Sequence, residues 1–274
     1  MACPDPSGRR KRAEIGSHWI DTCDQARVRW HLERPDSYGP FDSAMARFRV
    51  ITVSRLLRLR AGDSILVVGA GSGWESAFFE TTGLRVISCD ISADMSKIAK
   101  MRRDLEQKAF EVIVCDGNLL PFPDQSIAAV LFADSLHHFE DLKAAVTEAM
   151  RVARAAIGSF GDPMDSVIRR VAITLGHDAT EYSGFLPQLI AKEELEAILA
   201  EGGFRLLALR GFFDWLPKPA LEAIPESIQR AVAAAYRLLN RPPWKVGSTQ
   251  IWIAERIGAL PSAPKILGSR NETD

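Results

Sequence analysis

A short segment rich in glycine has the residue types and spacing most suited to chemistry. It directly follows the apolar run 65–68 and consists of Gly69, Ala70, Gly71, Ser72 and Gly73. A glycine-rich turn between a strand and a helix exposes backbone N–H groups and lets a ligand approach the main chain closely. The dinucleotide fingerprint needs a further glycine where this chain has Trp74. The spacing therefore favours an adenosine cofactor without a pyrophosphate, and a nicotinamide dinucleotide is the weaker alternative.

Two acidic residues support this interpretation. Asp90 lies 17 positions beyond Gly73 and ends an apolar segment, and Asp116 ends the next one. A carboxylate at the first place can accept hydrogen bonds from ribose hydroxyls, and one at the second from the adenine amino group. Either acid alone could be a turn or helix cap. Because ligands bind at the carboxyl edge of open α/β sheets, the turn and both acids together predict an adenosine site.

The elements that must position these residues follow from hydrophobic periodicity. Apolar runs alternate with helical segments, a pattern typical of a parallel sheet with helices on both faces. We predict seven strands, at about 65–68, 85–89, 110–114, 127–133, 155–160, 204–209 and 250–254. Helices are expected at 43–60, from 74 onward, and at 92–108, 140–153, 163–175, 192–200 and 217–240. Asp42 or Ser43 is the expected cap of the first of these helices.

The order of motifs resembles a known family. The run 65–73 resembles the first motif of class I S-adenosylmethionine-dependent methyltransferases. Three later stretches are similar to the small-molecule branch that includes the ubiquinone and menaquinone C-methyltransferases. They are Asp116-Gly117-Asn118 with Leu120-Pro121-Phe122-Pro123-Asp124, then Leu136-His137-His138-Phe139, and then Tyr182-Ser183 leading to Gly202-Gly203-Phe204. The resemblance covers about residues 43–256.

This resemblance implies an α/β fold with a Rossmann-like seven-stranded sheet of order 3-2-1-4-5-7-6. The last strand would be antiparallel, with helices on both faces and helical lid insertions. It also implies S-adenosyl-L-methionine as cofactor. The glycine turn would line the methionine and ribose side, Asp90 would hold the ribose, and Asp134 would lie near the sulfonium. The cofactor-binding residues carried over are Gly69, Ala70, Gly71, Gly73, Asp90, Ile91, Asp116, Gly117 and Asp134.

The chain also departs from the family pattern. The usual acid two places before the first glycine helps to hold the cofactor's amino group, and here that place is Val67. The usual Phe-Asp opening of the fourth strand is Ile127-Ala128, and the usual Lys-Pro-Gly-Gly turn before the fifth strand is absent.

His137 and His138 are the candidate catalytic residues. Methyl transfer is an in-line displacement that positioning and desolvation can accelerate without a base. A base is needed chiefly when the acceptor is a hydroxyl or an acidic carbon, and a histidine near neutral pH can take that proton. In the alternative interpretation, the two histidines cap the following helix or pack beneath the cofactor.

Composition limits the possible functions. Lys+Arg 34 against Asp+Glu 35 gives a net charge of −1, which argues against general nucleic-acid binding. No apolar run approaches the roughly 18 residues of a membrane span. The four cysteines form no Cys-x-x-Cys pair, so we expect reduced thiols in a cytoplasmic protein and no metal site.

The sequence divides into three expected parts. Residues 1–42 would be a helical lid, 43–257 the methyltransferase domain with helical insertions near 163–190 and 217–245, and 258–274 a mobile tail. The expected function is methyl transfer to a small organic acceptor at oxygen, nitrogen or carbon. The alternative is a cofactor-binding protein without methyl transfer, either a non-catalytic partner or an enzyme that uses the cofactor for another reaction. The oligomeric state stays open.

Overall fold

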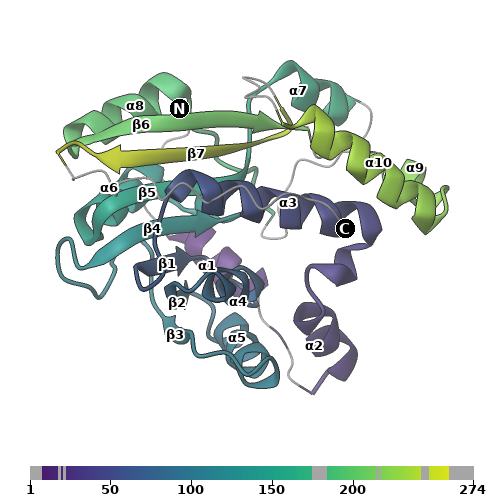
Figure 1. Ribbon diagram of the computed structural model, residues 1–274, viewed down its shortest axis with the longest axis horizontal. Helices are drawn as coiled ribbons and strands as arrows, with labels where there is room; N and C mark the ends of the chain where they lie inside the picture. The colour runs from purple at the N-terminus through teal and green to yellow at the C-terminus, as the bar shows by residue number, and fades with distance from the viewer. Residues whose placement is uncertain are drawn as a thin grey trace, which may run out of the picture.

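A seven-stranded sheet forms the centre of the computed structural model, which describes residues 8–17, 20, 23–174, 184–213, 216, 218–241 and 247–258. The strand order is β3-β2-β1-β4-β5-β7-β6 (Figure 1). Neighbouring strands from β3 to β5 run parallel, and β7 is antiparallel to both β5 and β6. The predicted order and the antiparallel last strand are confirmed.

The strands lie where the apolar runs predicted them. All seven residues of β4 are buried, as expected for a strand that is covered on both faces. β5 and β6 are longer than predicted, because Pro163 at the end of β5 and Phe212 at the end of β6 both pair with Thr249 of β7. The strands are β1 (Ser64–Val68), β2 (Arg85–Asp90), β3 (Glu111–Val114), β4 (Ile127–Ala133), β5 (Ala153–Pro163), β6 (Phe204–Phe212) and β7 (Thr249–Arg256).

Helices cover both faces of the sheet, where the two largest clusters of the core lie. One cluster joins α3 (Pro40–Leu57) and α4 (Trp74–Thr81) to the sheet, and the other joins α6 (Leu142–Val152) and α8 (Lys192–Glu201). Next to β2 and β3 lies α5 (Ala93–Leu105), and α10 (Glu226–Leu239) packs on α3 (Figure 1). The remaining elements are α1 (Arg9–Ser17), α2 (Gln25–Leu32), η1 (Asp36–Tyr38), η2 (Leu136–His138), α7 (Val167–Thr174) and α9 (Lys218–Glu222).

The start of α3 differs from the prediction. Its N-cap is Gly39, and Pro40 occupies the first helical position, so the expected caps Asp42 and Ser43 already lie inside the first turn. Proline is common at the first helical position because its fixed φ suits the helix and because an N–H at that position would have no partner within the helix. The Ser43 hydroxyl instead donates to the Asp36 carboxylate at 2.9 Å.

Some predicted features lie outside the described residues. Residues 175–183 belong to the first predicted helical insertion and include Tyr182 and Ser183. Residues 242–246 lie at the end of the second insertion, and the residues from 259 onward belong to the predicted tail. Among the helices of the described ranges, none combines the length and the apolar character that a membrane crossing requires.

Candidate active site

The glycine turn between β1 and α4 has left-handed backbone geometry at every second residue. The φ angles of Gly69, Gly71 and Gly73 are 65°, 52° and 75°, which residues with a Cβ rarely adopt. At Gly71, a Cβ atom would also lie 3.3 Å from the Met95 methyl carbon. The N–H of Ala70 donates to the Cys89 carbonyl at 3.0 Å, which fixes the turn against the end of β2. The sequence pattern thus predicted a turn whose conformation requires glycine.

Asp90 closes this turn from the neighbouring strand. One carboxylate oxygen accepts from the Gly71 N–H at 2.8 Å, and the other accepts from the Ser92 N–H at 2.8 Å. The side chain is half-buried, and Ile91 beside it is half-buried as well. Asp90 therefore fixes the loop, which is the turn role considered from the sequence, and its carboxylate lies at the strand end where the ribose is expected.

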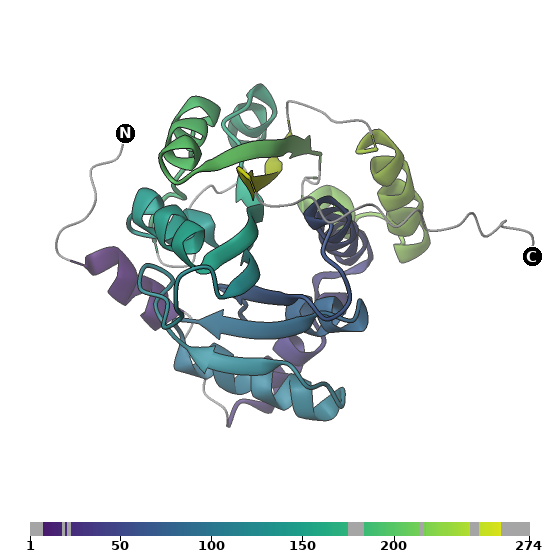
Figure 2. The same cartoon turned by 60° about the vertical axis from the view of Figure 1, so that its left-hand side comes forward.

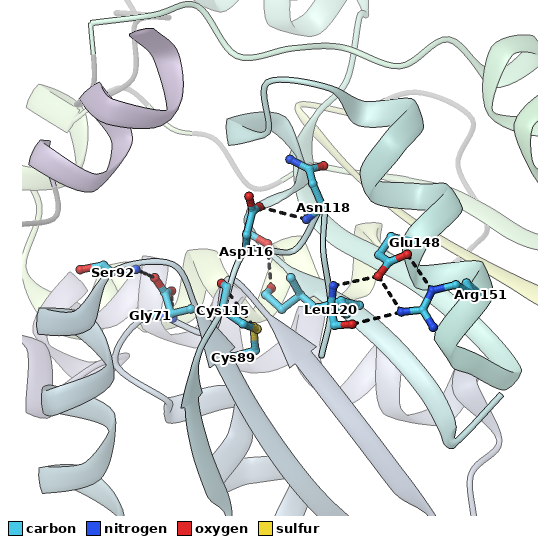
Figure 3. Close-up of a disulfide and its surroundings, with 12 residues drawn as sticks. Gly71, Cys89, Ser92, Cys115, Asp116, Asn118, Leu120, Glu148 and Arg151 are labelled. Atoms are coloured by element: carbon cyan, nitrogen blue, oxygen red, sulfur yellow. Dashed lines mark hydrogen bonds and ion pairs between the residues drawn. A yellow bond between two sulfur atoms is a disulfide. The ribbon is translucent and has the colours of Figure 1, made fainter. Parts of the chain in front are cut away.

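Asp116 and Gly117 lie at the end of β3, on the same edge. The Asp116 carboxylate accepts from the Asn118 N–H at 3.0 Å (Figure 3). It also forms an ion pair with Lys11 of α1. A Cβ atom at Gly117 would lie 2.6 Å from the ring of Phe139, so no side chain fits there. The structure thus brings both predicted acids and the glycine turn together at the carboxyl edge of β1, β2 and β3.

The cysteine prediction is wrong for one pair. Cys89 and Cys115 form a disulfide with a Cα–Cα distance of 6.1 Å, just before the two site acids (Figure 3). β2 and β3 are parallel neighbours in register, with Cys89 opposite Ile113, so their ends meet at one edge although 26 positions separate the cysteines. Sequence spacing cannot reveal this proximity. Among the described cysteines, Cys23 is free and exposed.

The stretch at 120–124 that supported the resemblance has a structural role. The Glu148 carboxylate of α6 accepts from the Leu120 N–H at 2.8 Å (Figure 3). Arg151 donates to the Phe122 carbonyl at 2.8 Å and to the Asp124 carboxylate at 2.7 Å. The hydrogen bond from Arg151 holds the pKa of Glu148 below its usual value. These contacts clamp the chain after Asp116 onto α6.

The loop after β4 lies against the glycine turn. The Ser135 hydroxyl donates to the Val68 carbonyl at 2.8 Å, and a Cβ atom at Gly69 would lie 2.2 Å from the Ser135 Cβ. Asp134 is exposed and has a φ of 52°, an uncommon value for a residue with a side chain. Gly161 leaves room for it, because a Cβ atom there would lie 2.3 Å from an Asp134 carboxylate oxygen. The loop thus places Asp134 and η2 beside the predicted cofactor edge.

His137 belongs to a buried network that sequence reasoning missed. Its Nδ1 lies 2.9 Å from an Asp162 carboxylate oxygen, and its backbone N–H donates to the same oxygen at 3.1 Å. The other Asp162 oxygen accepts from the Ser159 hydroxyl. A bulge in β5 between Phe160 and Asp162 produces this arrangement. Bulges often redirect side chains next to active sites, and Gly161-Asp162-Pro163 was the available sequence signal.

The N-terminal helix α1 contacts His138 and the loop around it. Nδ1 of His138 lies 3.2 Å from the Glu14 carboxylate, and the two histidine rings are 4.1 Å apart. The buried Arg10 guanidinium donates to the carbonyls of His137 at 2.8 Å, His138 at 3.1 Å and Leu186 at 3.0 Å. Figure 2 shows α1 next to the arrowheads of the parallel strands. Charged residues of the first 17 positions therefore reach both predicted histidines.

A second group of charged residues lies on the other side of the glycine turn. Glu75 is 7% exposed in the first turn of α4. Burial raises the pKa of Glu75 to about 8, the nearby Asp134 carboxylate adds to this rise, and the guanidinium groups of Arg34 and Arg102 oppose it. Burial also raises the pKa of Tyr38, which therefore stays a neutral phenol at physiological pH. Glu75 was not among the site residues that the sequence pattern predicted.

Comparison with known proteins supports the geometry. Residues 66–156 match the family described as a methyltransferase domain. A demethylmenaquinone methyltransferase of Thermobifida fusca is 35% identical over 95 residues, which are 34% of this chain and 40% of that protein. The chain therefore spans less than half of the length of this curated relative.

Two further comparisons cover more of the chain. A Mycolicibacterium smegmatis protein, whose name reads "probable S-adenosylmethionine-dependent methyltransferase", is 29% identical over 193 residues, 68% of this chain and 71% of its own length. The solved structure of a SAM-dependent methyltransferase from Aquifex aeolicus has a TM-score of 0.52 at 17% identity, covering 85% of this chain and 97% of that one. The latter shows the fold alone. The predicted class I methyltransferase fold is thus confirmed, and these names agree with the predicted cofactor.

Proposed function

We propose that this chain transfers the methyl group of S-adenosylmethionine to a small organic acceptor. The observation that carries the proposal is the junction of the glycine turn with Asp90, whose carboxylate accepts from the Gly71 N–H at 2.8 Å. A left-handed turn, a ribose-position acid and an adenine-position acid lie at the carboxyl ends of three adjacent strands. This is the edge where open α/β sheets bind ligands. The acceptor atom stays open.

The residues present fit the adenosine part of this cofactor. Asp90 would hold the ribose hydroxyls, and Asp116 with Gly117 would meet the adenine edge, with Ile91 against the ring. When bound, the cofactor supplies an electrophilic methyl group on a positively charged sulfur. The chain's own contribution would be to orient the reactants and to exclude water, which can account for much of the acceleration of a displacement.

His137 is the proposed base when the acceptor is a hydroxyl or an acidic carbon. Asp162 accepts a hydrogen bond at Nδ1, so Nε2 becomes the basic nitrogen of the neutral ring. Asp162 lies in the sheet, whereas the carboxylate that holds His138 comes from α1. A base that is oriented by the sheet keeps its direction when α1 moves, and this difference favours His137 over His138.

We also infer that the N-terminal segment is a lid. Its helix α1 reaches the adenine-side acid through Lys11 and the histidine loop through Arg10 and Glu14. A small-molecule acceptor could then be enclosed between α1 and the carboxyl edge of the sheet. No nucleic-acid partner is proposed, because the chain has a net charge of −1.

Calorimetry and product analysis test the proposal. Titration with S-adenosylmethionine and with S-adenosylhomocysteine should show one site for each ligand. Incubation with methyl-labelled cofactor and a panel of small phenols, amines and quinols should then give a labelled product together with S-adenosylhomocysteine. A folded protein that binds neither ligand would refute the proposal. Binding of both ligands with turnover that leaves the methyl group on the cofactor would favour an enzyme that uses it for another reaction.

A further inference from the structure

Val67 has no carboxylate to bind the cofactor's amino group, and the proposed function assigns no other residue to that role. The family pattern has an acid at this position for the cofactor's amino group. Here Val67 is fully buried in β1, between Ser88 of β2 and Leu131 of β4, and it packs in the core. An ammonium group at the methionine end of the cofactor therefore needs a carboxylate from another part of the fold.

Glu75 is the buried carboxyl group that the arrangement offers. It follows Gly73 by two positions, in the first turn of the helix that the glycine turn begins. The side chain is 7% exposed, its carboxyl accepts a hydrogen bond from its own backbone N–H, and it forms no ion pair with another described residue. A buried carboxyl group without a cationic partner is unfavourable when ionised. This site is therefore suited to receive a positive charge.

Asp134 forms the second half of the site. It lies at the end of β4, the strand next to β1, and Ser135, which follows it, lies against Gly69 of the turn. Its carboxylate contributes to the raised pKa values of both Glu75 and Tyr38. The absence of a side chain at Gly161 leaves the space that this carboxylate occupies.

The positive groups around Glu75 are held by other partners. Arg102 is buried, and its guanidinium donates to the carbonyls of Ser72 at 2.9 Å, His31 at 2.9 Å and Leu32 at 2.7 Å. Arg34 stacks on the rings of Trp30 and Tyr38, at 4.5 Å and 5.1 Å from their centroids. Arg102 thereby ties the segment before η1 to the glycine turn. On the α3 side, Arg49 acts on Tyr38.

We propose that Glu75, together with Asp134, binds the α-ammonium group of the cofactor's methionine end, in place of the acid that Val67 replaces. This inference rests on the proposed function. In the free protein the Glu75 carboxyl keeps its proton. The arriving ammonium stabilises the carboxylate, and the proton passes to the solvent buffer, so that charge balances with one proton released per ligand bound.

The sign of the pH dependence follows from the Glu75 pKa of about 8 in the free protein. At pH 7 such a group is protonated in about nine molecules of ten. Binding should therefore release close to one proton at pH 7 and fewer above pH 8. The affinity of the wild-type protein for the ligand should rise between pH 6.5 and 8.5, because less free energy is then needed to ionise Glu75.

Isothermal calorimetry with S-adenosylhomocysteine tests this inference without any measurement of activity. Titrations at pH 7 in phosphate and in Tris, which differ in ionisation enthalpy, give the number of protons released. Glu75→Gln should remove the release, flatten the pH dependence and weaken binding by roughly 10- to 100-fold at pH 8.5, the range for hydrogen bonds to charged groups. Asp134→Asn should reduce the release at pH 7, because the pKa of Glu75 falls without its like-charged neighbour.

Two controls isolate the ammonium group. 5′-Methylthioadenosine lacks the amino-acid part of the cofactor, so its binding should release no proton and should be equal in wild-type protein and Glu75→Gln. Glu193→Gln changes an exposed glutamate in the first turn of another helix, α8. It should leave the affinity, the proton release and the pH dependence of binding unchanged.

The outcomes separate the two proposals. If S-adenosylhomocysteine binds to Glu75→Gln with wild-type affinity and the same proton release, the assignment of Glu75 is overturned and the proposed function stands. If the folded wild-type protein binds neither S-adenosylhomocysteine nor 5′-methylthioadenosine, the proposed function fails, and this inference fails with it.

Discussion

The two halves of the carboxyl edge are built in different ways. At the ends of β1, β2 and β3, the contacts join backbone groups to an acid on the neighbouring strand, such as Asp90 to Gly71. At the ends of β4 and β5, side chains from distant elements meet, such as His137 with Asp162 and His138 with Glu14. The first half depends on backbone conformation and the second on tertiary packing. Substitutions in the two halves should therefore fail in different ways.

The largest expected effect is in the backbone-built half. Gly71→Val should remove detectable binding of S-adenosylhomocysteine while most of the fold persists. A valine at φ 52° is strained, and its Cβ would lie 3.3 Å from the Met95 methyl carbon, so the turn must change shape. Calorimetry and far-UV circular dichroism check the two parts of this prediction.

A matched variant controls for strain alone. Gly203→Val places the same side chain at a φ of 73°, where nothing lies within 4 Å of the new Cβ, before β6 and away from the site. It should cost about 1–2 kcal/mol of stability and retain binding. Retained binding in Gly71→Val would show that the turn is not the cofactor site.

The next effect concerns the half that side chains build. If the acceptor is a hydroxyl, His137→Asn should lower turnover by about 10²–10⁴-fold, the usual contribution of a general base. Cofactor affinity should stay within a few fold, because the histidine acts on the acceptor. The pH–rate profile should also lose its acidic limb. Steady-state kinetics on the identified acceptor measures these effects.

His138→Asn is the comparison variant for this prediction. Because Glu14 of α1 holds His138, this change should affect the acceptor KM more than turnover. Near-native turnover in both variants would mean that neither histidine is the base and that catalysis rests on positioning. Loss of turnover in His138→Asn alone would reverse the assignment.

A smaller effect returns to the backbone-built half. Asp90→Ala should weaken cofactor binding by roughly 1.5–3 kcal/mol, the range for hydrogen bonds to a charged group. Asp63→Ala is a matched control, because Asp63 accepts from the Arg60 N–H at 2.8 Å before β1, at the opposite edge of the sheet. Unchanged affinity in a folded Asp90→Ala would leave Asp90 as a turn residue only.

The smallest effect concerns α1 of the proposed lid, where Lys11 forms an ion pair with Asp116. Lys11→Ala should strengthen cofactor binding by less than about fivefold, because it frees Asp116 from an ion pair whose members are partly exposed. Calorimetry at two salt concentrations checks this, because added salt should reduce the difference in cofactor affinity between the wild type and the variant. Weaker binding in the variant would show that Lys11 contacts the ligand and does not compete with it.

The sequence predicted the fold because its signals are local. The apolar run at 65–68 and the fully buried β4 gave strands at the right places, and Gly69, Gly71 and Gly73 gave the turn. The start of α3 was misplaced because a cap at Gly39 with Pro40 competes with Asp42 and Ser43 as a helix start. Boundaries of this kind depend on one or two residues.

What the sequence by itself determined is the strand–turn–helix unit with its two acids, because backbone preferences and strand ends are set within a few residues. Only the tertiary structure decided the partners across longer separations. It joined Cys89 to Cys115, bonded His137 to Asp162 and brought Glu14 to His138. It also buried Glu75 in the first turn of α4. These contacts arise from strand order, a bulge and the docking of α1, and no local pattern in the chain encodes the distance between such residues.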